Sequence, residues 1–210
     1  MGVSSAPTTH RDLDRGAAVT RRLEDAALEL FATRGFAATT VDDLAAAGGV
    51  GRRTFFRYFP TKLDVVLGEL DSRLEALARA LETCGEDPDA LACARRAFLA
   101  VNRYAEHEVP SLRRRLTLLE EVPELAAHAA QRYRAWEMVL AADAARRWRI
   151  EPGALAAQVL ARIEVAAMQG VFAVWLARAD AGAGELATLV GDAFDAVARG
   201  FTHPAPGPGY

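Results

Sequence analysis

The sequence predicts an all-α fold of about nine helices, with three short helices first and longer ones after them. Alanine and leucine supply much of the 51% hydrophobic content, while β-branched residues are sparse, and this composition favours helix. Apolar residues recur at helical spacing along most of the chain, and prolines and glycines interrupt the pattern. The sequence carries no strand pattern and no internal repeat.

Four segments are expected from these patterns. Residues 1–18 have no hydrophobic period, and the tail at 204–210 is rich in proline and glycine, so both are expected to be flexible. We expect a domain of three short helices over residues 19–65 and a larger helical domain over residues 66–203. The longer helices are expected at about residues 61–81, 88–106, 111–121, 124–148, 153–178 and 185–201.

The smaller domain has three local signals. Its first helix carries one apolar stripe and is followed by Gly35, which is placed to end the helix in a left-handed conformation. Thr40 and Asp43 have the spacing of a capping box at the start of a second helix, which ends at Gly48–Gly49. Val50 is then expected to restart the chain into a third short helix that contains Arg52 to Tyr58 and is ended by Pro60.

The third helix is basic and aromatic. Residues 48–62 contain three arginines, one lysine and no acid, a net charge of +4 in a chain whose formal net charge is -3. We expect no acid near this helix, so its local basic face can attract a polyanion. Phe55 and Phe59, four residues apart, share one helix face and should pack as core. The side chains on the other faces are Arg52, Arg53, Phe56 and Arg57.

Two short helices joined by a glycine turn match the spacing of a helix-turn-helix, whose second helix enters the major groove of DNA. Arginine can pair with guanine, and an aromatic ring or a threonine methyl group can contact the thymine methyl group. Tyr58 and Lys62 can reach phosphates at the margins, and Thr40 offers a hydroxyl and backbone amides at a helix N-terminus. The alternative for the arginines is a solvated face that binds nothing.

This segment resembles the N-terminal domain of TetR-family transcriptional regulators over about residues 20–68. The matching stretches are LEDAALELFATRGF and TTVDDLAAAGGVGRRTFFRYFPTKLDVV. The resemblance implies backbone contacts by Thr40, Thr54, Tyr58 and Lys62, and a recognition surface made by Arg52, Arg53, Phe56 and Arg57. Gly51 and Phe56 depart from the serine and tyrosine that are usual in the family, which bears on the operator sequence.

A narrower similarity is to regulators associated with mycofactocin gene clusters in actinobacteria. It is carried by VGRRTFFRYFPTK and by EVPSLRRRLTLLEEVPELAAHAAQRYRAWEMVLA. The two resemblances imply a ligand-responsive repressor that binds a palindromic operator as a dimer. They also imply release by a small apolar effector, with an acyl-CoA as the candidate.

The helix expected at 153–178 is apolar on almost every side, so it should be buried on two sides. One side can face its own domain and the other a partner subunit. Small residues there and in the helix at 185–201 permit close helix crossings. We therefore expect a homodimer held by a four-helix bundle, as the family resemblance also implies.

A ligand pocket is expected in the middle of the larger domain, although ordinary core packing is the alternative for each residue. The aromatic and thioether candidates are Tyr104, Tyr133, Trp136, Met168, Phe172 and Trp175. Glu164, the one charged residue in a strongly apolar stretch, is a pocket group, an intersubunit partner or an exposed edge residue. Arg113, Arg114 and Arg115 form one run that could hold the phosphates of a coenzyme A ester or lie on a solvated face.

Other features bound the class of protein. Cys84 and Cys93 lie nine residues apart without a CxxC motif or a secretory leader, so we expect a cytoplasmic protein without a disulfide. The longest apolar stretch, at 163–177, is shorter than the ~20 residues that span a bilayer, so we expect no membrane segment. No cofactor and no metal is expected.

Two other classes of function remain as alternatives. An enzyme would need a catalytic motif, but the sequence has no Gly-rich phosphate loop, nucleophile elbow or HExxH, and its histidines are scattered. Glu124 and His128 could form half of a metal site with Glu120 or Glu121. The other class is an all-α ligand-binding or scaffold protein without DNA binding, which salt-sensitive DNA binding would exclude.

Overall fold

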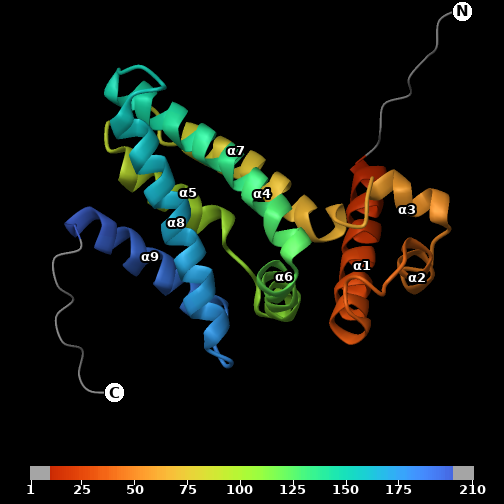
Figure 1. Cartoon of the computed structure of the whole chain (residues 1–210). Coiled ribbons are helices and arrows are strands. Elements are labelled where there is room, and N and C mark those ends of the chain that lie inside the picture. Colours follow the sequence, from red (N-terminus) through yellow and green to blue (C-terminus); the bar gives the residue numbers. More distant parts are fainter. Residues whose placement is uncertain (1–9, 201–210) are drawn as a thin grey trace, which may run out of the picture. The chain divides into compact units, whose positions relative to one another are not determined.

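A computed structural model of the chain describes residues 10–200. It divides into two compact units, one ending at Gly68 and the other beginning at Glu69. Within residues 10–200 there are nine α-helices, one short 3-10 helix and no strand, which confirms the all-α prediction (Figure 1). The expected tail at 204–210 lies outside the described residues.

The first unit contains α1 (His10–Arg34), α2 (Val41–Ala47), α3 (Arg52–Tyr58) and the start of α4 (Asp64–Glu82). α2 contacts both α1 and α3. α1 begins at His10, which corrects the expected flexible arm for residues 10–18, while residues 1–9 lie outside the described part. Residues 10–18 contain no proline, and their arginine, leucine and alanine residues favour helix, so α1 extends beyond its apolar stripe.

Glycines follow the ends of α1 and α2, and a capping box starts α2, as the sequence predicts. Gly35 (φ 83°) and Gly49 (φ 65°) have the left-handed conformation, which favours glycine. At the start of α2, the Asp43 amide donates to Oγ1 of Thr40 (3.2 Å), and the Thr40 amide donates to the Asp43 carboxylate (2.9 Å). The hydrogen bond from the Thr40 hydroxyl holds the pKa of Asp43 below its usual value.

Phe55 and Phe59 anchor α3 in the core of the first unit. Both are buried (0% and 3% exposed), and their ring centres lie 5.6 Å apart. The end of α2 packs tightly on α1, since a Cβ atom on Gly48 would lie 2.1 Å from Cδ2 of Leu23. The predicted core role of Phe55 and Phe59 is therefore confirmed, and the other faces of α3 are left accessible.

The second unit contains the rest of α4 and six further elements. These are α5 (Ala90–Val101), the 3-10 helix η1 (Glu106–Glu108), α6 (Val109–Glu121), α7 (Pro123–Trp148), α8 (Leu155–Ala177) and α9 (Ala183–Arg199). α8 contacts α7 and α9, and α5 also contacts α7 and α9 (Figure 1). The helix expected at 88–106 is shorter, because helical geometry ends at Asn102, whose side-chain amide donates to the Phe98 carbonyl (2.9 Å).

α8 is long and strongly apolar. It has 23 residues and a mean hydropathy of 1.6 over its most apolar window, so by length and composition it could cross a membrane. The helix is longer than the apolar stretch at 163–177, so length alone does not exclude a membrane segment. Core helices of soluble proteins have the same character, and α8 buries Met168, Val171 and Trp175 in the core of the second unit.

Candidate functional site

α3 presents a basic and aromatic surface. The residues predicted from it to contact DNA are exposed or half-buried: Arg52, Arg53, Thr54, Phe56, Arg57 and Tyr58. Phe56 is 40% exposed, which is unusual for a phenylalanine and leaves its ring free to touch a base. Gly51 is the N-cap of α3 and makes no side-chain hydrogen bond there, so the cap serine usual in the family has no replacement.

Arg52 pairs with an acid from the preceding helix. Its Nη1 atom lies 2.8 Å from Oδ1 of Asp42, and the two side chains are 59% and 70% exposed. The Arg52 guanidinium also lies 5.3 Å from the centre of the Phe56 ring. The expectation that no acid lies near α3 was therefore wrong. Because the ion pair is exposed to solvent it is weak, so a phosphate or a guanine can replace Asp42 as the partner of Arg52.

Lys62 binds backbone carbonyls of its own unit. Its ammonium donates to the carbonyl oxygens of Phe36 (2.7 Å) and Thr39 (3.1 Å), and it lies 4.2 Å from the centre of the Phe36 ring. Lys62 thus ties the segment before α4 to the loop that ends at Thr40. An ammonium has three N–H donors, so one is left for a DNA phosphate.

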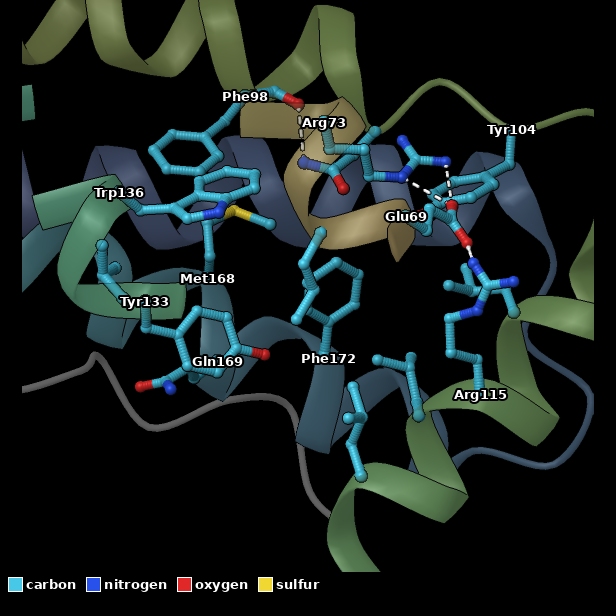
Figure 2. Close-up of a pocket in the computed structure, with 16 residues that line it drawn as sticks. Glu69, Arg73, Phe98, Tyr104, Arg115, Tyr133, Trp136, Met168, Gln169 and Phe172 are labelled. Atoms are coloured by element: carbon cyan, nitrogen blue, oxygen red, sulfur yellow. Dashed lines mark hydrogen bonds and ion pairs between the residues drawn. The ribbon is translucent and has the colours of Figure 1, made fainter. Parts of the chain in front are cut away.

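A cavity in the second unit lies among α4 to α8. Its enclosed volume is about 50 Å³, well below the ~300–1,000 Å³ that is usual for small-molecule sites, so a ligand has to widen it. The lining is mostly apolar, and charged side chains gather at one side, opposite Trp136 and Tyr133 (Figure 2). The space is a narrow one between side chains, with Phe172 in the middle of the view.

Five of the predicted ligand-binding residues line this cavity: Tyr104, Tyr133, Trp136, Met168 and Phe172. The Trp136 ring stacks on Phe98, with the two ring centres 5.8 Å apart. Burial raises the pKa of Tyr104 to about 12. The Tyr104 hydroxyl therefore keeps its proton at neutral pH and can donate a hydrogen bond to a ligand.

Arg113 and Trp175 contact each other and are not among the residues that line the cavity. The Arg113 guanidinium lies 4.2 Å from the centre of the Trp175 ring. It donates to the carbonyl oxygens of Arg178 (2.6 Å) and Ala181 (2.7 Å). These bonds tie α6 to the loop between α8 and α9, so the donors that were expected to hold phosphates are used inside the chain.

Glu164 is buried in the second unit. It is 2% exposed, which excludes the exposed edge position, and it is not among the residues that line the cavity. Burial raises the pKa of Glu164 to about 9, and the nearby charge of Asp143 adds to the effect. The carboxyl is therefore protonated at neutral pH. Arg114, like Glu164, is not among the residues that line the cavity.

The sequence analysis missed an ionic cluster at one side of the cavity, made by Glu69, Arg73 and Arg115. Nε and Nη2 of Arg73 each lie 2.6 Å from Oε1 of Glu69, and Arg115 pairs with the other carboxylate oxygen (Figure 2). The Arg73 guanidinium lies 4.1 Å from the centre of the Tyr104 ring, and burial lowers its pKa. The available signals were the spacing of four between Glu69 and Arg73, and the position of Arg115 three residues after buried Leu112.

Metal ligands do not gather in the part of the chain that the structure describes. Between residues 10 and 200, no group of three or more His, Cys, Asp or Glu side chains is placed to hold a metal ion. Glu124 and His128 therefore have no third ligand of these types beside them there. Cys84 and Cys93 are free thiols.

Two models of known protein families match the chain, one in each unit. Residues 23–68 match the tetR family of bacterial regulatory proteins, and residues 89–202 match the MftR C-terminal domain. The chain belongs to the TetR family of transcriptional regulators. Its larger domain is of the MftR type, which confirms the narrower resemblance predicted from the sequence.

Individual relatives match over part of their length. The chain is 35% identical over 119 residues to a Mycobacterium tuberculosis protein named as the mycofactocin biosynthesis transcriptional regulator MftR, covering 57% of this chain and 60% of that protein. It is 44% identical over 85 residues to the HTH-type transcriptional regulator TcmR of Streptomyces glaucescens, covering 39% and 38%. The matches thus span less than two thirds of these relatives.

A solved structure matches over nearly the whole chain. Thermus thermophilus FadR, a TetR-family transcriptional repressor in complex with lauroyl-CoA, is 25% identical with a TM-score of 0.55, covering 91% of this chain and 100% of that one.

Replacing Glu164 should flatten the pH dependence of stability. The folded-state pKa is raised from 4.5 to about 9, so the folded chain keeps a proton that the unfolded chain releases. Stability is therefore highest below the unfolded pKa and is lost as the pH rises toward the folded one. Glu164→Gln does not ionise, so we expect it to be roughly 2 kcal/mol more stable than the wild type at pH 8 and much closer to it at pH 5.

Urea unfolding at the two pH values measures this difference in the free energy of unfolding. Glu120→Gln, at an exposed position of α6, is the control and should follow the wild type at both pH values. An equal pH slope in Glu164→Gln and the wild type would contradict the buried protonated carboxyl.

Proposed function

We propose that the chain is a transcriptional repressor that binds a palindromic operator in the cytoplasm as a homodimer and is released by an apolar effector. Membership of the TetR family supports DNA binding. The observation that carries the proposal is the accessible basic and aromatic face of α3, held by buried Phe55 and Phe59 in a helix-turn-helix unit.

In this proposal α3 lies in the major groove. Arg53 and Arg57 suit guanine, and the exposed ring of Phe56 suits a thymine methyl group. Arg52 exchanges Asp42 for a phosphate or a base. The residues proposed to contact the DNA backbone are Thr40, Thr54, Tyr58 and Lys62.

An exposed apolar stripe on α8 supports the homodimer. Leu155 is 78% exposed, Val159 43% and Ile163 38%, and their spacing of four places them on one face of the helix. A second copy of the chain can cover this stripe, since a two-fold dimer uses the same surface on both subunits. The dimer would then present two α3 helices to grooves ~34 Å apart, which requires a palindromic operator.

An acyl-CoA is the proposed effector. The apolar lining of the cavity suits an acyl chain. Thermus thermophilus FadR, which matches nearly the whole chain, is in complex with lauroyl-CoA. Because the cavity is narrow, side chains such as Phe172 have to move when a chain enters. Such a movement is the step by which binding in the second unit can weaken DNA binding.

Removing the arginines of α3 should weaken operator binding. Arg53→Ala and Arg57→Ala are each expected to lower the affinity by about tenfold or more, since a bidentate arginine–guanine pair contributes about 1–3 kcal/mol. Fluorescence anisotropy with DNA from the adjacent intergenic region, at several salt concentrations, measures the effect.

Arg79→Ala is the matched control, because Arg79 is an exposed arginine of α4 in the second unit that pairs with Glu75. It should leave operator binding unchanged. If the unaltered chain binds no DNA at low salt, the ligand-binding or scaffold alternative is correct.

A charge on the α8 stripe should separate the subunits. We expect Val159→Asp to sediment as a monomer at micromolar concentration while the wild type sediments as a dimer, because the carboxylate would be buried at the interface without a partner. Circular dichroism checks that the variant keeps its helices, since Val159 is already partly exposed in the single chain. Met138→Asp, at a 72% exposed apolar position of α7, is the control and should remain dimeric. Monomeric wild-type protein would rule out the homodimer.

A further inference from the structure

The ionic cluster of Glu69, Arg73 and Arg115 is unusual for the wall of an apolar cavity. Two guanidinium groups share one carboxylate, and the side chain of Arg115 is only 6% exposed. Charges removed from water lose hydration, and this loss can exceed the attraction between them. Hydrophobic side chains could hold α4 against α6 at least as well, so stability alone does not explain a charged cluster in this place.

A second polar group on the cavity wall supports a ligand with a polar part. The indole Nε1 atom of Trp136 is buried and makes no hydrogen bond to any residue in the described part of the chain. Buried donors are nearly always paired, so an unpaired one on a residue that lines the cavity suggests an acceptor on a bound molecule.

The space available to such a molecule is elongated. A second cavity of about 240 Å³ adjoins the first at Tyr133 and Phe172. The two cavities share five lining residues: Leu116, Leu119, Tyr133, Gln169 and Phe172. Rotation of these side chains would join the cavities into one path. The ionic cluster lines the first cavity, and Ala126, Ala129 and Ala130 of α7 line the second.

We propose that the Glu69 carboxylate competes with the anionic group of an elongated amphiphilic effector for Arg73 and Arg115. The effector's anion takes over ion pairs that Glu69 makes, and its chain extends past Phe172. This inference rests on the proposed function, which makes the cavity the effector site. It adds the side chains that bind the anionic group of the effector. The anion can be the carboxylate of a fatty acid or a phosphate of its coenzyme A ester, since guanidinium groups bind both.

The exchange connects the cavity to the helix that enters the first unit. Glu69 and Arg73 lie on α4, which begins at Asp64, while Arg115 lies on α6. When an effector replaces Glu69 as the partner of Arg115, the ionic link between these two helices is lost. Glu108 is a further acid near Arg73, but its carboxylate is exposed and accepts a hydrogen bond from the Ala105 amide (2.7 Å), so it is a weaker competitor.

Calorimetric titration without DNA tests the competition. The probes are decanoate, decanoyl-CoA and the neutral 1-decanol. For Glu69→Gln, which keeps the shape of the side chain and removes its charge, we expect affinity for the anionic probes to rise about tenfold. Affinity for 1-decanol should stay unchanged. A rise for decanoyl-CoA alone identifies a phosphate as the anion, and a rise for decanoate identifies the carboxylate.

Two further variants make the result specific. Glu69→Gln combined with Arg115→Gln removes both charges of one pair, so the fold should survive and the preference for anionic probes should fall toward that for 1-decanol. Glu75→Gln, at an exposed position of α4 that lines neither cavity, should behave as the wild type.

The proposal is overturned if Glu69→Gln changes the affinity for all three probes equally or lowers it for the anions. Failure of the wild type to bind any probe also overturns it. None of these titrations involves an operator. A chain that passes them but never binds DNA would refute the proposed repressor function and leave the competition standing.

Discussion

Burial of α8 is the constraint on which the rest of the second unit depends. A helix that is apolar on most sides is stable in water only when other surfaces cover it. α7 and α9 cover part of α8, and Met168 and Phe172 give another part to the cavity wall. The stripe that begins at Leu155 remains exposed in the single chain. One helix therefore supplies the core, the ligand wall and the surface proposed to meet a second subunit.

α4 provides the covalent link between sensing and DNA binding. It begins at Asp64 in the first unit and carries Glu69 and Arg73 in the second. Gly68 stands at the junction, where an added Cβ atom would have nothing within 4 Å, so packing does not require a glycine. Glycine within a helix costs about 1 kcal/mol relative to alanine, which makes this turn of α4 easier to deform. A change in the ionic cluster thus acts at Glu69, the residue next to this glycine.

Local sequence signals predicted much of the first unit. They could not predict the contacts between helices that are distant in the sequence. Capping at Thr40 and the glycine at Gly35 depend on a few neighbouring residues. The run from Arg113 to Arg115 was read as one group, but successive residues of a helix point about 100° apart. Arg113 therefore binds the loop after α8, whereas Arg115 faces Glu69. Only the packing of α6 decides which of the two arginines takes which partner. The burial of Glu164 and the pairing of Arg52 with Asp42 likewise depend on neighbours that the local sequence does not specify.

The most direct test of the regulator is a titration of decanoyl-CoA into the complex of the chain with a DNA fragment from its adjacent intergenic region, followed by DNase footprinting. We expect a protected palindrome at moderate salt, and a loss of protection as decanoyl-CoA is added. A chain that protects no site, or a footprint that persists at saturating decanoyl-CoA, would contradict it.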